Sequence, residues 1–134
     1  MNSTTKNSGD ILPSYRNPPV DEVVCGFRFE RFRGLKLPHI GLLWEKFRND
    51  FPVTEHAVPI ATDNSLPVDE ATGIPLPRVW FISKADNELI QFQSDRLYYN
   101  WRHRGDEYPR YPSIIKKFET VKSQLEVFAK ELEL

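Results

Sequence analysis

The sequence holds one cysteine, Cys25, and only three histidines. A lone cysteine cannot form an intrachain disulfide, and so few thiol and imidazole groups leave no zinc-type ligand set at the usual spacing. No stretch approaches the roughly 20 apolar residues of a membrane-spanning helix, and no apolar signal-peptide core follows Lys6. We therefore expect a cytoplasmic protein with no membrane contact, no metal and no cofactor.

An excess of charge of one sign is also missing. Eighteen Lys and Arg residues oppose nineteen Asp and Glu residues, which gives a net charge of -1, so no overall field attracts nucleic acid. With 134 residues, 40% of them hydrophobic, the chain fits one globular domain. The polar, proline-containing residues 1–19 predict a mobile N-terminal arm, and residues 20–134 predict a single α+β domain.

Hydrophobic periodicity predicts the elements of that domain. Val23, Cys25, Phe27 and Phe29 alternate with other residues, as in a strand with one buried face. Helical spacing of apolar residues from Ile40 to Phe51 predicts a helix that Pro52 stops. The remaining segments are predicted as a strand over 54–60, a long loop over 61–77, and three strands over 78–83, 88–93 and 96–102.

A long final helix is predicted after Pro112. Its apolar residues recur at steps of four and three, so they form one stripe that needs a partner surface. The expected fold is therefore α+β, with an antiparallel sheet of about five strands in the order β-α-β-β-β-β-α and the C-terminal helix packed on one face. This order resembles half of a TATA-binding-protein-like or helix-grip arrangement. The stripe consists of Ile114, Phe118, Val121, Leu125, Phe128 and Leu132.

One face of the predicted sheet is rich in polar side chains. Alternation places Ile90, Phe92, Leu97, Tyr99 and Trp101 on the apolar face and leaves amide, phenol and guanidinium groups on the other. Glutamine and asparagine are uncommon in the middle of strands, which favours a binding surface, whereas a solvated sheet face is the competing interpretation. The candidate binding residues on this face are Arg28, Gln91, Gln93, Tyr98, Asn100 and Arg102.

A second candidate is a basic and aromatic segment over 91–111. Arginine with tyrosine and tryptophan suits phosphate contacts and base stacking, although Asp95, Asp106 and Glu107 reduce its positive field. The same residues also suit a structural role, in which the Tyr-Pro-Arg-Tyr-Pro turn fixes the chain before the last helix. The candidate residues are Arg96, Trp101, Arg104, Tyr108, Arg110 and Tyr111.

Catalytic motifs are missing. The sequence has no G-x-S-x-G, no phosphate-binding G-x-x-x-x-G-K-[ST], no H-E-x-x-H and no G-x-G-x-x-G. We therefore expect a non-enzymatic protein-interaction module that binds a protein partner or itself as a homodimer. One alternative is nucleic-acid or nucleotide binding through 91–111. Another is a small-ligand pocket protein or enzyme that uses a carboxylate such as Asp95 or Glu22.

Several short motifs resemble a sporadically distributed bacterial protein family of uncharacterised function. The resemblance covers about residues 16 to 130 and implies either a short form or a fragment, because members of that family usually carry a second half. A missing half implies an uncovered face or edge at which the chain would dimerise or bind a protein. The patchy distribution implies an accessory, phage-defence or toxin-linked system carried by mobile elements. The motifs are Asn17-Pro18-Pro19-Val20-x-Glu22, Gln93-x-Asp95-Arg96, Asn100-Trp101-Arg102 and Tyr108-Pro109-Arg110-Tyr111.

Overall fold

The computed structural model describes residues 22–105 and 109–134; the predicted arm over 1–19 and Tyr108 lie outside the described residues. It has the predicted α+β fold, with five strands and two helices in the expected chain order. The elements are β1 (Glu22–Arg28), α1 (Leu37–Phe47), β2 (Val53–Ala57), β3 (Arg78–Ile82), β4 (Glu88–Gln93), β5 (Arg96–Arg102) and α2 (Tyr111–Glu131).

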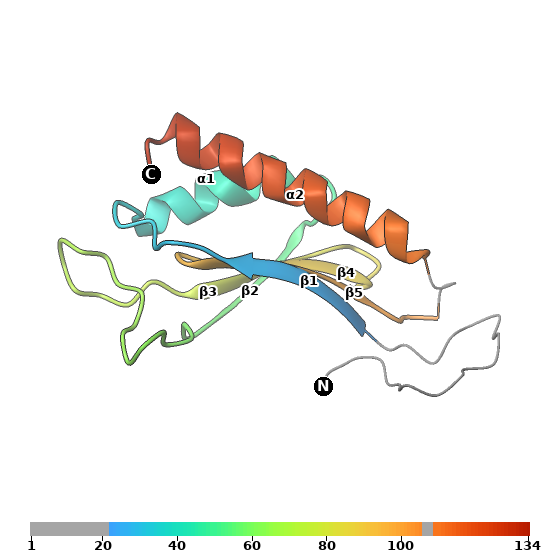
Figure 1. Cartoon of the computed structure of the whole chain (residues 1–134), viewed down its shortest axis with the longest axis horizontal. Coiled ribbons are helices and arrows are strands. Elements are labelled where there is room, and N and C mark those ends of the chain that lie inside the picture. The colour runs from blue at the N-terminus through green and yellow to red at the C-terminus, as the bar shows by residue number, and fades with distance from the viewer. Residues whose placement is uncertain (1–21, 106–108) are drawn as a thin grey trace.

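The five strands form one antiparallel sheet in the order β1-β5-β4-β3-β2. Strands β2 to β5 follow one another as a meander, while β1 comes from the other end of the domain and, among the described strands, pairs with β5 alone. Both helices lie on the same face of this sheet, as Figure 1 shows. None of the helices in the described part of the chain is long and apolar enough to span a membrane.

Several element boundaries differ from the predicted ones, and three of them have a clear physical reason. Helix α1 ends at Phe47, and the ring of Phe51 is buried from the segment after it, where the Phe51 N–H donates to the Phe47 carbonyl at 2.8 Å. Strand β2 ends at Ala57, before Pro59, which has no N–H for the sheet ladder. Helix α2 begins at Tyr111 with Pro112 inside its first turn, where a missing N–H costs no helical hydrogen bond.

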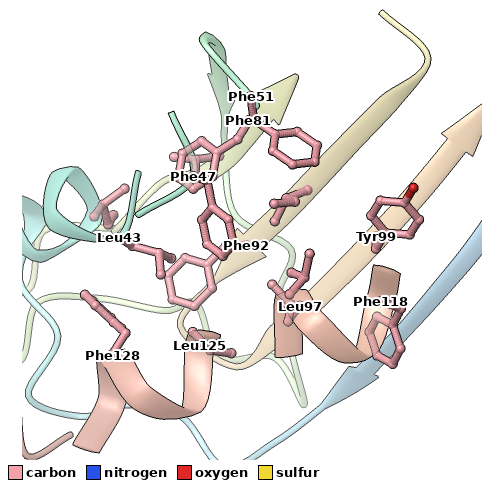
Figure 2. Packing of buried hydrophobic residues seen from close by; sticks show 14 of the residues in the cluster. Leu43, Phe47, Phe51, Phe81, Phe92, Leu97, Tyr99, Phe118, Leu125 and Phe128 are labelled. Atoms are coloured by element: carbon pink, nitrogen blue, oxygen red, sulfur yellow. The ribbon is translucent and has the colours of Figure 1, made fainter. Parts of the chain in front are cut away.

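The hydrophobic core lies between the helices and the sheet. The predicted stripe of α2 is buried from Ile114 to Phe128, and Leu132 packs against the core at its margin. Helix α1 adds Leu43 and Phe47, and Figure 2 shows their side chains meeting Phe92 beside the α2 residues. The apolar alternation therefore predicted correctly which face of the sheet the helices cover.

Gly26 lies at a close approach between β1 and β5. A Cβ atom at Gly26 would lie 2.0 Å from Cδ1 of Tyr98 and 2.7 Å from the carbonyl oxygen of Leu97. Since a backbone atom is involved, Gly26→Ala is expected to lower the free energy of unfolding by about 1–3 kcal/mol, as urea denaturation would measure. Gly41→Ala is the control, because a Cβ on that helical glycine meets nothing within 4 Å. Equal stability of Gly26→Ala and the wild type would contradict the close approach.

Candidate interaction surface

The strand register places the predicted polar residues on the sheet face away from the helices. Gln91 lies beside Tyr98, Tyr98 beside Gly26, and Asn100 beside Val24. The residues that alternate with them are in the core on the other face. The predicted division of the sheet into two faces is confirmed, and the binding role of the polar face stays a prediction. The helix-side residues of β4 and β5 are Ile90, Phe92, Leu97, Tyr99 and Trp101.

A chain of side-chain hydrogen bonds crosses four strands of this polar face. Trp80 Nε1 on β3 donates to Gln91 Oε1 on β4 at 2.7 Å, and Gln91 Nε2 donates to Asn100 Oδ1 on β5 at 3.0 Å. Asn100 Nδ2 then donates to the Glu22 carboxylate on β1. The amides that the sequence offered as ligand-binding groups thus bind one another, and the Glu22 carboxylate is held at the edge of the sheet. Trp80 was not among the candidate residues, because no sequence signal reveals which side chains face each other across strands.

The loop between β2 and β3 covers one end of the polar face. Gln93 is 1% exposed, and its amide exchanges hydrogen bonds of 2.9 Å with the backbone N–H and carbonyl of Ile60. Arg96, predicted as a phosphate-contacting residue, is also buried, and it bonds to Asp95 and to the Thr62 hydroxyl. Neither Gln93 nor Arg96 is presented to a ligand at the surface. They hold the loop against the sheet instead.

Asp95 is the centre of this buried cluster. Its carboxylate accepts hydrogen bonds from Arg96 Nε at 3.0 Å, from Gln93 Nε2 at 2.8 Å and from Thr62 Oγ1 at 2.8 Å. Burial by itself raises the pKa of Asp95, but the bonds from Arg96, Thr62 and Gln93 outweigh burial and hold the pKa below its usual value. The carboxylate suggested for a ligand pocket is therefore ionised and saturated with internal donors.

The basic and aromatic candidates that the structure describes do not form one exposed patch. Trp101 is 2% exposed and packs in the core, so the ring is not available for base stacking. Arg102 and Arg104 both pair with Asp86, at 2.6 and 2.9 Å. Arg110 and Tyr111 are exposed where α2 begins. Alternation had placed Trp101 on the apolar face, and burial of its large indole favours that position over a surface one.

A groove of about 470 Å³ lies on the helix side of the sheet, between α1 and α2. Its polar lining includes Glu88, which accepts hydrogen bonds from Tyr99 Oη at 2.8 Å and from Lys117 Nζ at 2.9 Å. Burial, reinforced by Glu88, raises the pKa of Tyr99 and keeps the phenol protonated. The predicted pocket carboxylates, Asp95 and Glu22, do not line this groove. Among the residues the structure describes, no three His, Cys, Asp or Glu side chains form a group that suits a metal.

The outer edge of β1 is the feature that the sequence did not reveal. Among the residues that the structure describes, β1 is the last strand of the sheet, next to β5. Phe29, one residue beyond β1, donates its N–H to the Asp95 carbonyl at 2.9 Å, so the odd-numbered residues of β1 direct their backbone groups toward β5 in the regular antiparallel pattern. Glu22, Val24, Gly26 and Arg28 therefore direct their N–H and C=O groups outward. Finding this edge requires the pairing of β1 with β5, which periodicity alone does not supply.

Comparison with known proteins gives no relative from which a role could be transferred, because no family model, no curated protein and no solved structure matches the chain.

Proposed function

We propose that this protein is a non-enzymatic interaction module that binds an extended strand at the outer edge of β1. The observation that carries the proposal is the row of outward backbone groups on Glu22, Val24, Gly26 and Arg28, within the last strand of the described sheet. An unpaired edge is a template for another strand, and main-chain hydrogen bonds supply the affinity of such binding.

The two edges of the sheet differ in how well they accept a strand. Strand β2, at the other edge, has five residues between Pro52 and Pro59, and prolines and shortness both discourage pairing. Strand β1 has seven residues and no internal proline, and Val24, next to its central residue, is 50% exposed. The length of β1, its lack of an internal proline and its exposed Val24 support its use as an interface.

Two further observations favour binding over chemistry. The polar groups suggested for ligand binding or catalysis already form hydrogen bonds within the protein. Gln91 bonds to Asn100, Asn100 bonds to Glu22, and Asp95 bonds to Arg96. Two of the arginines suggested for phosphate contacts, Arg96 and Arg104, are in ion pairs, which favours the protein-interaction hypothesis over the nucleic-acid one. We place the module in the cytoplasm, and the resemblance of its motifs to a sporadic bacterial family would place it in an accessory, defence- or toxin-linked system.

A peptide selection tests this proposal. A library of random extended peptides is selected against the wild type, with the variant Val24→Pro as the counter-target. Because the N–H of Val24 faces outward, the proline removes no bond to β5 but blocks strand addition. We expect alternating apolar peptides that bind the wild type about tenfold or more tightly than Val24→Pro, in line with one or two lost hydrogen bonds of about 0.5–1.5 kcal/mol each.

The matched control for this selection is Val24→Thr, which keeps the backbone N–H and a β-branched side chain. It should bind the selected peptides within about threefold of the wild type, since the main-chain bonds remain. Thermal melting of both variants establishes that they are folded. If every selected peptide binds Val24→Pro as well as it binds the wild type, the β1 edge is not the binding site.

A further inference from the structure

We infer that the strand accepted at this edge is β1 of a second copy of the chain, paired antiparallel with Cys25 opposite Cys25. This inference rests on the proposed function and names the partner. It follows from the sequence of the strand, Glu-Val-Val-Cys-Gly-Phe-Arg, which carries a negative charge at one end and a positive charge at the other. Two such strands in antiparallel alignment complement each other.

The charges select the register of the pair. With Cys25 at the centre, Glu22 of each copy lies opposite Arg28 of the other, so the dimer contains two identical ion pairs. A centre at Val24 would place Glu22 opposite Gly26, and a centre at Gly26 would place Glu22 opposite Glu30. Opposite charges across a strand pair are favourable and like charges are unfavourable, so only the Cys25-centred register uses both charged ends.

Both charged side chains lie on the polar face of the sheet, the face away from the helices. Glu22 is oriented there by the Asn100 amide, and a carboxylate has further lone pairs with which to accept a second donor. Arg28 is exposed at the other end of the strand. Strand β1 therefore presents the two members of the ion pair on one face, at equal distances from Cys25.

The apolar centre of the strand fits the same register. Val24 of one copy lies opposite Gly26 of the other, and the Tyr98 ring covers that glycine on the polar face. The half-exposed Val24 side chain would then pack against the Tyr98 ring of the second copy. This contact buries apolar surface that the monomer leaves in water, and the glycine leaves room for it.

The backbone pattern is also consistent with a two-fold axis at Cys25. The outward groups belong to the even-numbered residues, so Val24 opposite Gly26 and Glu22 opposite Arg28 form hydrogen-bonded pairs. Cys25 occupies a non-hydrogen-bonded position, where opposed Cα atoms lie about 4.5 Å apart, within the range that a disulfide can bridge. An axis perpendicular to the sheet keeps the helices of both copies on one side and makes a continuous sheet from β2 of one copy to β2 of the other.

Charge reversal tests the register. The variants Glu22→Arg and Arg28→Glu each place like charges opposite one another at both ends of the dimer strand pair. We expect each variant alone to dimerise about tenfold or more weakly than the wild type, as light scattering over a concentration series would measure. An equimolar mixture of the two should recover wild-type dimerisation. In the mixed pair the arginine introduced at position 22 lies opposite the glutamate introduced at position 28, and the native Glu22 and Arg28 meet at the other end.

The control reversal is Glu55→Arg on β2, the exposed strand at the opposite edge. It changes the net charge as Glu22→Arg does and should leave dimerisation unchanged. Recovery in the mixture also distinguishes charge repulsion at the interface from a folding defect. If Glu22→Arg dimerised weakly only because it had lost the bond between Glu22 and Asn100, addition of Arg28→Glu would not restore dimerisation. A mixture that stays as weak as its components overturns the proposed register.

Oxidative cross-linking provides an independent readout. Cys25 is the single cysteine of the chain, so a covalent dimer formed under mild oxidant joins Cys25 to Cys25, and the dependence of its rate on the charge reversals reports the register. Burial raises the pKa of the Cys25 thiol, and the oxidation is therefore carried out at alkaline pH. We expect cross-linking in the wild type and about a tenfold slower reaction in Glu22→Arg and in Arg28→Glu alone.

The outcomes separate this inference from the proposed function. If the wild type is monomeric and does not cross-link, yet selected peptides still discriminate against Val24→Pro, the edge binds strands but the partner is not a second copy. If the protein dimerises without sensitivity to the charge reversals or to Val24→Pro, self-association uses another surface and the inference is wrong. If Val24→Pro changes neither the affinity for the selected peptides nor the dimerisation of the protein, both proposals are wrong.

Discussion

Asp95→Ala is expected to lower the free energy of unfolding by about 3–5 kcal/mol, the range for removing one member of a buried ion pair. The variant leaves the Arg96 guanidinium buried without its carboxylate and removes one acceptor each from Thr62 and Gln93. The loop from β2 to β3 loses the cluster that holds it, so amide exchange near Ile60 should accelerate as well. Urea denaturation followed by circular dichroism measures the loss.

Glu119→Ala, an exposed change on α2, is the control and should alter stability by less than about 0.5 kcal/mol.

Acid titration gives a second readout of the role of Asp95. Because the folded pKa of Asp95 is lowered, its contribution is present above the unfolded-state pKa of about 3.9 and is lost as pH falls through the folded value. Asp95→Asn should therefore show a flatter decline in stability below about pH 4 than the wild type. A loss below about 1 kcal/mol for Asp95→Ala would contradict the structural role of the cluster.

Phe92→Ala is expected to lower the free energy of unfolding by about 3–5 kcal/mol, as for other buried aromatic truncations. The Phe92 side chain is 1% exposed and lies between the sheet and both helices (Figure 2). Its ring centroid is 6.4 Å from that of Phe32. Its removal leaves a cavity that the rigid sheet and the two helices cannot fully close. Thermal and urea denaturation would both report the change.

The comparison for Phe92→Ala is Tyr111→Ala, which deletes a ring of similar size from a residue that is 56% exposed. The cost of that change should be below about 1 kcal/mol, because little apolar surface returns to water. Similar losses for the two variants would mean that the core between sheet and helices does not depend on Phe92.

Hydrophobic periodicity predicted the local elements well because each buried side chain follows the period of its own strand or helix. The spacing of Phe92, Leu97 and Tyr99 identified the helix-side face, and the stripe of α2 identified its buried residues. The same alternation placed Trp101 on the apolar face, where its side chain is buried. The separate prediction that Trp101 stacks on a base conflicts with this alternation.

Long-range pairing could not be predicted in the same way. Burial of Gln93 and Arg96 depends on a loop whose composition resembles that of any exposed connection, and the bonds that hold it join residues more than thirty positions apart, as between Ile60 and Gln93. The outward edge of β1 likewise depends on the pairing of Glu22 with Arg102. Periodicity is a property of neighbouring residues and contains no information on such contacts.

The strand order has a consequence for how the chain folds. Strands β2 to β5 are neighbours both in sequence and in the sheet, and short turns join β3 to β4 and β4 to β5, whereas β1 must find β5 at the far end of the domain. Contacts of such high sequence separation form slowly, because the loop-closure entropy is lost before the contacts are gained. During synthesis β1 leaves the ribosome before its partner strand exists, and it remains without β5 until almost the whole sheet has been translated.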